Sequence, residues 1–382
     1  MQNYGFILTL AKTGMTKCEM DEAGDMAALA IPFAAGAAAG YFATGLGGPA
    51  VSWVLPGALL GAVAALFPLL LSSRRPGPGY GILFFLLGAF CQCSQVLLPL
   101  SVSGPPTLPE RACAALKRLI ASVPYPHGRS AGIVQALMTG DRSGLDPGTV
   151  AAFRGSGASH ILALSGLHLG LIYLIVRRVF ALLGNTPAAR KGRCAATLAA
   201  CGFYTLMTGA GPSVVRAFLY VCVSEASSLD TGRRRDPARI LLAALTLQLA
   251  ASPGVIAGVG FQLSYLAMLG ITLLLPRLQA WYPAPRTRLE RADPMRKVWN
   301  AAAMTLSCQA FTAPLAWIRF HTFPTYFLLT NLLSLPLSGA VMTVSAATLA
   351  LSAAGVCPYF LVRISDALIE ALLFVLETIS SM

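Results

Sequence analysis

Two histidines, a serine and several small residues enter an apolar stretch together. The segment reads His160-Ile-Leu-Ala-Leu-Ser165-Gly166-Leu-His168 and continues into apolar residues. Unpaired polar groups are costly inside a membrane, so this segment is the first place to look for function. A continuous helix over residues 158–176, turning about 100° per residue, predicts that His160, Ser165 and His168 lie on one side.

Three interpretations of this strip are open. The polar groups hold a helix bundle together, with Gly166 admitting a neighbouring helix; or the strip lines a polar cavity or pore; or Ser165 and His168 belong to a hydrolase. For the hydrolase, no orienting carboxylate stands at an evident spacing, although Asp141 is close in sequence. Two imidazoles without further ligands do not make a metal site. We expect no metal, no cofactor and no enzymatic activity.

Other polar side chains interrupt apolar segments further along the chain. Each one alone is commonly an interhelical hydrogen bond, but together they indicate a bundle with a polar interior. A guanidinium in this setting needs a partner or water. These residues are Arg216, Gln262, Ser264, Gln309 and Asn331.

Composition points to a membrane. Of 382 residues, 56% are apolar and only 11% are charged, whereas soluble proteins average about 25% charged residues. The net charge of +13 gathers in short clusters between apolar segments, as the positive-inside rule describes. We predict an all-α, polytopic integral membrane helix bundle of about ten transmembrane or re-entrant helices, because each crossing needs about 20 residues.

The order of apolar and basic segments predicts four regions. They are a cytoplasmic segment at 1–25, a three-helix membrane region at 26–100 that includes a second span at 51–71, an external connector at 101–130, and a membrane domain at 131–382. Arginine clusters at 74–75, 177–178, 233–235 and 277–297 then face the cytoplasm. Proline and glycine predict half-helices or re-entrant pieces around Pro212, Pro253, Pro314 and Pro336.

Five motifs in order resemble the membrane domain of the ComEC competence family, over about residues 131–337. They are Gly140-Asp141; the segment from His160 to His168; Pro212-Ser-Val-Val-Arg216-Ala; Gly260-Phe-Gln-Leu-Ser264; and Gln309 with Thr312-Ala-Pro314-Leu, followed by Asn331-Leu-Leu and Pro336-Leu. The resemblance implies a multi-pass channel of the bacterial cytoplasmic (inner) membrane that passes single-stranded DNA into the cytoplasm during natural transformation.

The resemblance also implies partners. They are single-stranded DNA, the lipid bilayer, and separate DNA-receptor, nuclease and cytoplasmic motor proteins, with a homo-oligomer left open. Family members commonly carry an OB-like domain and a metallo-β-lactamase-like domain, and this sequence has room for neither, so we expect a short form without a nuclease site. The alternatives are a small-solute or ion transporter, a membrane-embedded Ser/His hydrolase, or an inactive truncated relative.

A path for DNA needs cations for phosphates and aromatic rings for bases. Besides Arg216, the expected cations are those of the predicted external connector: Arg111, Lys117, Arg118 and Arg129. The expected rings are Tyr204, Phe261 and Tyr265, which serve equally well as packing residues.

Overall fold

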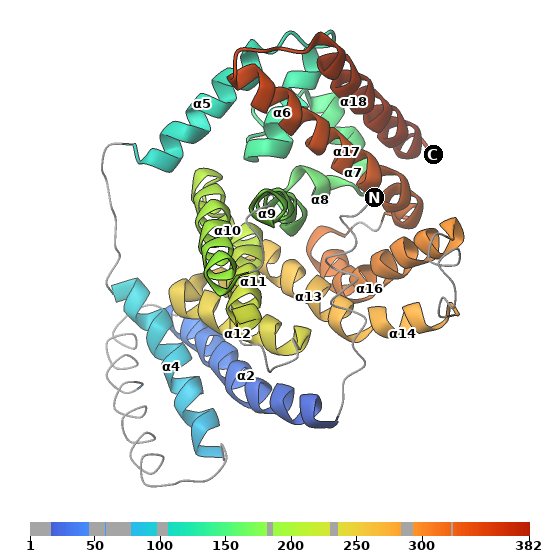
Figure 1. Cartoon of the computed structure of the whole chain (residues 1–382). Helices are drawn as coiled ribbons and strands as arrows, with labels where there is room; N and C mark the ends of the chain where they lie inside the picture. The colour runs from blue at the N-terminus through green and yellow to red at the C-terminus, as the bar shows by residue number, and fades with distance from the viewer. Residues whose placement is uncertain are drawn as a thin grey trace. The chain divides into compact units, whose positions relative to one another are not determined.

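The computed structural model is helical throughout the part of the chain that it describes (Figure 1), namely residues 17–45, 58, 78–97, 106–181, 186–229, 236–283, 293–321 and 324–382. No strand occurs in these ranges, which confirms the all-α prediction. The predicted second span at 51–71, apart from residue 58, and the arginine clusters at 74–75 and 233–235 lie outside the described residues.

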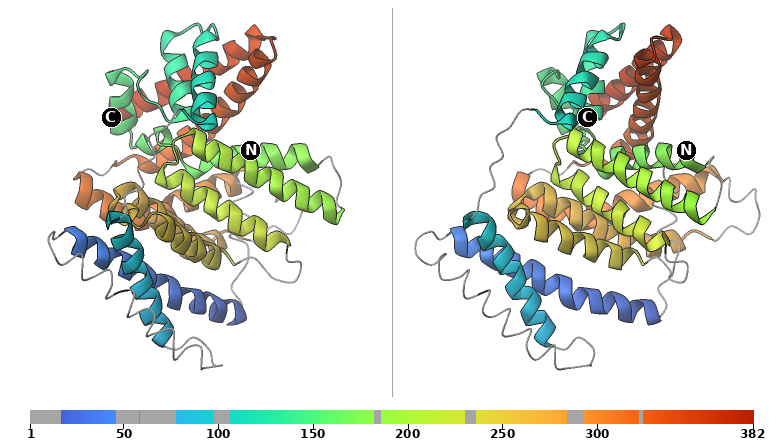
Figure 2. Two further views of the ribbon diagram at one scale, coloured as in Figure 1. Left: turned by 90° about the vertical axis from the view of Figure 1, so that its left-hand side faces the viewer. Right: turned by 60° about the vertical axis from the view of Figure 1, so that its left-hand side comes forward.

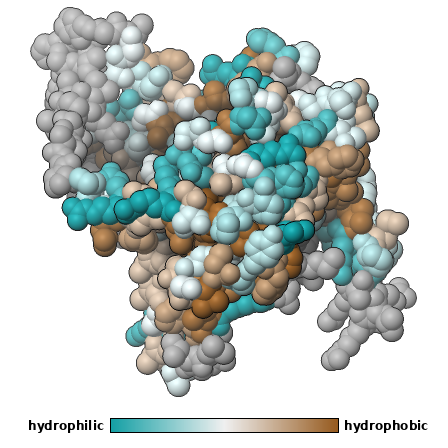
Figure 3. Space-filling view, turned by 90° about the horizontal axis from the view of Figure 1, so that it is seen from above, coloured by the Kyte–Doolittle hydropathy of each residue, from teal (hydrophilic) through white to brown (hydrophobic). Residues whose placement is uncertain are grey.

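Among the described residues, four helical segments are long and apolar enough to cross a membrane. They are Asp25–Gly45, Val259–Ala280, Pro294–Phe320 and Phe327–Ala353. Large apolar side chains are exposed on the surface, among them Phe42, Ile318 and Phe374, and Figure 3 shows brown apolar patches between teal polar ones on one face. Apolar exposure of this kind suits lipid better than water. The protein is therefore a helical membrane protein.

The described residues fall into two compact units. The first contains Pro105–Phe218 and Arg277–Met382, and the second contains residues up to Gly104 and Leu219–Pro276. The helices within the first unit are α5 (Leu108–Ser122), α6 (Gly128–Thr139), α7 (Pro147–Gly155), α8 (Ser159–Leu162), α9 (Gly166–Ala181), α10 (Pro187–Met207), α16 (Pro294–Phe320), α17 (Phe327–Ala353) and α18 (Tyr359–Ser380). Those within the second are α2 (Lys17–Gly45), α4 (Pro78–Leu97), α12 (Pro237–Ala251), the 3-10 helix η1 (Pro253–Ala257) and α13 (Val259–Leu273). The unit boundaries cut α11 (Pro212–Leu229) and α14 (Leu275–Ala280).

Several helices begin with the same two-residue signal. The side chains of Asp146, Thr186, Asp236 and Asp293 each accept a hydrogen bond from a backbone N–H in the first turn, and proline follows each of them. An Asp or Thr cap satisfies an N–H that has no partner within the helix. Proline at the next position has no N–H to satisfy and already holds the helical φ. These four pairs set where α7, α10, α12 and α16 begin.

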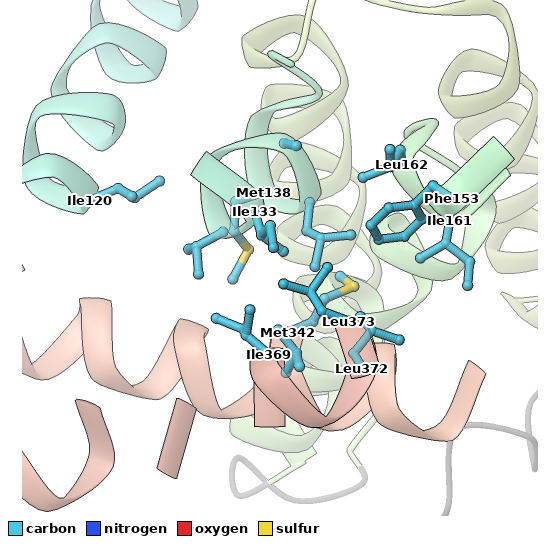
Figure 4. Close-up of a cluster of buried hydrophobic side chains, with 14 of the residues drawn as sticks. Ile120, Ile133, Met138, Phe153, Ile161, Leu162, Met342, Ile369, Leu372 and Leu373 are labelled. Carbon is cyan, nitrogen blue, oxygen red and sulfur yellow. The ribbon is translucent and has the colours of Figure 1, made fainter. Parts of the chain in front are cut away.

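An apolar core joins the helices of the first unit. Side chains from α6, α7, α8, α17 and α18 meet in it, and Figure 4 labels Ile133, Phe153, Leu162, Ile369 and Leu373 among its members. Helices α17 and α18 pack along each other (Figure 2). This core fixes the elements on which α8 and the start of α9 rest.

Charged and polar residues join the beginning of α6 to α18. Asp366 accepts hydrogen bonds from Ser130 Oγ at 2.7 Å and from the backbone N–H of His127 at 3.3 Å, and it also contacts the His127 ring at 2.7 Å. One turn later Arg129 Nε donates to Glu370 at 2.9 Å, and this contact lowers the pKa of Glu370. The predicted external connector therefore contains a helix, α5, and ends in a contact fixed by charge.

In the second unit, α2 and α4 lie side by side in all views (Figures 1 and 2). A Cβ on Gly36 would lie 1.8 Å from the backbone oxygen of Phe85, and one on Gly88 would lie 2.1 Å from that of Phe33. Only glycine permits such an approach of two backbones, a common device of membrane helices. Glycine thus allows close packing of this helix pair.

The prolines act differently from the prediction at two of four positions. Pro253 does lie in a break, the 3-10 helix η1. Pro212 begins α11, whereas Pro314 and Pro336 lie inside α16 and α17, each of which continues for 27 residues. Neighbouring helices and local hydroxyl groups can satisfy the backbone groups that a proline frees within a membrane helix. The expected half-helices at Pro314 and Pro336 are therefore wrong.

Candidate functional site

The segment from His160 to His168 is not one helix. Helix α8 ends at Leu162, Ala163 is extended, and α9 begins at Gly166. The prediction of a continuous helix over 158–176 is wrong, and with it the argument that His160, Ser165 and His168 share one helical face. The physical reason lies at Ser165, since serine is strongly favoured immediately before a helix, where its backbone is not helical.

Ser165 and His168 nevertheless meet, through a reciprocal helix cap. Ser165 Oγ accepts from the backbone N–H of Leu167 at 3.2 Å, and the backbone N–H of Ser165 donates to His168 Nδ1 at 3.1 Å. Ser165 Oγ is also 3.1 Å from Nδ1. The arrangement resembles a capping box, with histidine in the place usually held by glutamate or glutamine and with the serine hydroxyl bonded to the second N–H of the helix instead of the third.

The cap determines which nitrogen of His168 carries the proton. A backbone N–H can only donate, so Nδ1 is the acceptor and a neutral ring carries its hydrogen on Nε2. The His168 side chain is 2% exposed, and Nε2 has no hydrogen-bond partner among the described residues. A buried donor without a partner is rare in proteins and calls for an explanation such as water or a ligand.

Arg216 adds a positive charge at the same helix end. A Cβ built on Gly166, the first residue of α9, would lie 3.9 Å from Arg216 Nη2 and 3.5 Å from Ala217 Cβ. The charge of Arg216 also reaches Cys308 on α16. The amino-terminal end of a helix carries partial positive charge, so the guanidinium and the start of α9 bring positive charge to the same place.

The Gly140-Asp141 turn holds the residues before Ser165 in place. Gly140 has φ of 77° and ends α6, and a Cβ there would lie 2.5 Å from Leu164 Cδ1. Arg142 Nε donates to the carbonyl of Leu162 at 3.3 Å. Only glycine combines this backbone conformation with room for Leu164. The first two predicted motifs therefore join in one structure.

Asp141 itself is engaged by its neighbours. Its Oδ2 accepts from Lys117 Nζ at 2.6 Å and from Gln135 Nε2 at 3.1 Å, and its Oδ1 accepts from the backbone N–H of Ser143 at 3.0 Å. The Lys117 ammonium, followed by the Ser143 bonds, holds the pKa of Asp141 well below its usual range. Asp141 thus serves as an ionised tie between α5 and the end of α6.

Comparison with known proteins decides the family. The Competence protein family matches residues 137–382, which is more than half of the chain. The chain belongs to this family. ComE operon protein 3 of Bacillus subtilis (strain 168) is 31% identical over 207 residues, covering 54% of this chain and 24% of the relative. Competence protein ComA of Neisseria gonorrhoeae is 28% identical over 218 residues, covering 56% of this chain and 29% of the relative.

The chain thus spans less than a third of the length of these two family members. No solved structure matches it. The five motifs on which the resemblance rests all lie within the aligned family region, since the first begins at Gly140. Family membership is therefore a statement about the helical membrane domain.

The remaining candidate residues of this family member lie on other elements than α9. The His160 ring is exposed, with Nδ1 3.2 Å from the carbonyl oxygen of Gly157. In the second unit, Gln262 Nε2 donates to the Ile256 carbonyl at 2.8 Å and thereby closes the turn after η1, and Ser264 follows on the same helix, α13. Gln309 lies next to Cys308 on α16, half-buried.

Asn331 lies on α17 with a polar neighbour that the sequence analysis missed. Asn331 Oδ1 and Ser334 Oγ are buried and have no hydrogen-bond partner among the described residues. Residues three apart on a helix lie on the same side. The spacing of an amide and a hydroxyl inside an apolar run was the available signal, and like His168 Nε2 these atoms call for water or a ligand.

Most of the cations and rings expected to line a DNA path have partners within the protein. Lys117 pairs with Asp141, and Arg129 pairs with Glu370 and Glu377. Tyr204 is buried and donates to the Met138 carbonyl at 3.1 Å. Phe261 and Tyr265 contact each other with ring centroids 4.6 Å apart. Of the side chains expected to serve DNA, Arg216 lies at the α9 cap.

No group of three or more His, Cys, Asp or Glu residues suited to a metal ion occurs in the described ranges. The residues brought together at the candidate site are therefore Ser165, Gly166, His168 and Arg216, supported by the turn at Gly140. Their chemistry is hydrogen-bond donation and positive charge.

Proposed function

We propose that this chain provides the path by which single-stranded DNA crosses the bacterial cytoplasmic membrane during natural transformation. Two kinds of support meet in it. The chain belongs to the competence protein family, and one of the two relatives is named a competence protein. The observation that carries the proposal is the α9 cap, where the buried Nε2–H of His168 and the guanidinium of Arg216 share one helix end.

These two donors suit a phosphodiester. A strand of phosphates in a low-dielectric path needs cations and N–H donors in place of water. Arginine donates from a planar fork that matches two phosphate oxygens. A neutral histidine donor adds a hydrogen bond without trapping the anion by a second charge. Such a site is strong enough to admit a phosphate and weak enough to release it, as conduction requires.

The same geometry argues against a Ser/His hydrolase. A catalytic serine gives its proton to a histidine whose other nitrogen is oriented by a carboxylate. Here Nδ1 already accepts the backbone N–H of Ser165, and Nε2 has no partner in the described part of the chain. Ser165 Oγ is used as the helix cap. We therefore propose that the site does not catalyse hydrolysis.

In this proposal the chain is a multi-pass protein of the inner membrane. Separate proteins deliver the DNA outside, degrade the second strand and pull the strand inside. Polar atoms left open on α9 and α17, namely His168 Nε2, Asn331 Oδ1 and Ser334 Oγ, supply groups that water or the strand can satisfy. An association of several copies is compatible with this arrangement.

Uptake of labelled DNA tests the proposal in a naturally transformable host whose own copy is deleted. We expect Arg216→Gln to lower uptake about tenfold or more, because a hydrogen bond to a charged group contributes about 1.5–3 kcal/mol, and Arg216→Lys to retain part of it. Arg319→Gln, which removes one exposed positive charge near the end of α16, is the control and should leave uptake unchanged. Normal uptake with Arg216→Gln, at equal protein in the membrane, contradicts the proposal.

A further inference from the structure

Aromatic and basic side chains join the end of α14 to the start of α16 (orange in Figure 1). Trp299 Nε1 donates to the Leu278 carbonyl at 3.0 Å, and Tyr282 OH donates to Asp293 at 2.7 Å. The guanidinium carbon of Arg296 lies 5.1 Å from the Tyr282 ring centroid. These contacts fix the two helix ends against each other, so their aromatic rings are held in place before any ligand arrives.

Trp281 is the exposed member of this arrangement. Its ring stacks on Trp299 with centroids 6.3 Å apart and planes 23° apart, while the residue is 74% exposed. Trp299 therefore covers only one side, which leaves a flat aromatic surface open. Open rings supported from behind are the platforms on which single-stranded nucleic acids stack their bases.

Basic residues lie near this ring along the chain. Arg277 comes four residues before Trp281 and Lys297 two residues before Trp299, and both are exposed, while Arg296 is half-buried beside Tyr282. A carboxylate of the arrangement, Asp293, is engaged by Tyr282 and by the backbone N–H of Met295. An aromatic surface flanked by cations complements a chain of bases and phosphates. The positive-inside rule places this end of both helices on the cytoplasmic side.

We propose that Trp281, supported by Trp299 and flanked by Arg277, Arg296 and Lys297, is a stacking platform for single-stranded DNA at the cytoplasmic mouth of the path. This inference rests on the proposed function for its biological setting. Its content is separate, because it assigns a base-binding surface to residues outside the α9 cap.

Tryptophan near lipid headgroups is common at the ends of membrane helices, so a lipid surface is the competing occupant. Two features favour bases. The indole N–H of Trp299 is used inside the protein, at Leu278, and the Trp281 ring lies almost parallel to a second ring. A headgroup contact needs neither the stacked rings nor the fixed helix ends, whereas base stacking gains from both.

The test measures binding of 5′-fluorescein oligodeoxynucleotides to the purified full chain in neutral detergent by anisotropy. One oligonucleotide is a thymidine 12-mer, and the other has the same phosphates without bases. The platform predicts tighter binding of the 12-mer, since bases stack on exposed aromatic rings. Trp281→Ala should weaken its binding about tenfold and bring it near that of the abasic oligonucleotide. Trp281→Phe, which keeps a flat ring, should retain part of the preference.

Trp317→Ala is the matched control, because Trp317 is 57% exposed on the other end of α16 and should not affect the preference. Lys297→Gln should weaken the binding of both oligonucleotides equally. It should also reduce the salt dependence of binding by the equivalent of about one phosphate contact. Equal binding of the two oligonucleotides by the unmodified chain overturns the platform. An unchanged preference for the 12-mer in both folded Trp281 variants also overturns it. So does a result in which the Trp281 variants lose only their binding to anionic lipid in nanodiscs. If the preference is present but DNA uptake in cells does not need this chain, the proposed function fails and the platform stands.

Discussion

Replacing Ser165 by alanine tests whether the serine is a helix cap or a reactive group. The substitution removes the Oγ contacts with the Leu167 N–H at 3.2 Å and with His168 Nδ1 at 3.1 Å. The backbone N–H of Ser165 still donates to Nδ1. Loss of a serine cap costs about 1 kcal/mol, within a range of about 0.5–2 kcal/mol. We expect a destabilisation of that size and little else.

The assay pairs equilibrium unfolding of the purified chain in mixed micelles with DNA uptake in the deletion host. Ser165→Asn should restore most of the stability, because asparagine caps a helix as well as serine does. His168→Gln should also be mild, since glutamine completes a capping box and its amide still offers an N–H. His168→Ala removes both the acceptor for the Ser165 N–H and the Nε2–H donor. Uptake should therefore be retained with Ser165→Ala and Ser165→Asn and should fall with His168→Ala.

The opposite pattern refutes this reasoning. If Ser165→Ala and Ser165→Asn both abolish uptake while the folded protein is as stable as the parent, the hydroxyl takes part in chemistry. A reactive serine would lose activity by orders of magnitude in either variant. A cap would show its effect in the free energy of unfolding.

Three further predictions concern the surroundings of the site. Gly140→Ala should lower the free energy of unfolding by about 1–2 kcal/mol, because alanine resists positive φ and its Cβ meets Leu164; an unchanged unfolding midpoint contradicts the role given to this turn. Because Lys117 lowers the pKa of Asp141, the pair should stabilise the fold above the unfolded carboxyl pKa of about 4 and lose this contribution as the pH falls through the lower folded value. Asp141→Asn should flatten that acid dependence, by about 0.2–1 kcal/mol for an exposed pair, in unfolding measured between about pH 7 and pH 3. Reporter fusions after Arg178, Arg235 and Lys297 should read cytoplasmic and a fusion within 101–130 external, and an internal signal from the connector reverses the topology.

Much of the fold could be predicted from the sequence because composition and apolar length determine it. A membrane leaves the backbone few choices besides helices, so the all-α prediction needed no side-chain detail. The start of α9 was also legible, since Ser165 with His168 three residues later follows the spacing of a capping box. The prediction of a single helix over this run missed the start of α9, because apolar residues continue on both sides of the break.

Long-range contacts were beyond the sequence pattern. Nothing local indicates that Lys117 reaches Asp141 across the α5–α6 turn, or that Asp366 receives His127 and Ser130 from far along the chain. The continuity of α16 and α17 through Pro314 and Pro336 depends equally on neighbouring helices. At the site, the sequence indicated that Ser165, His168 and Arg216 matter, but only tertiary packing places Arg216 against Gly166.

The most direct test of the central claim is the reactivity of a thiol introduced in place of His168. His168 and Ser338 are equally hidden in the structure, at 2% and 0% exposure, so cysteines at both positions should be silent unless water reaches one of them. In a background without native cysteines, we predict that the His168→Cys variant is modified by a small polar thiol reagent, because thiolate formation requires water. The Ser338→Cys variant should stay unmodified, and DNA in transit should slow the reaction of the His168→Cys variant. If the thiol of the His168→Cys variant is as unreactive as that of the Ser338→Cys variant, with or without DNA, the α9 cap does not line the path.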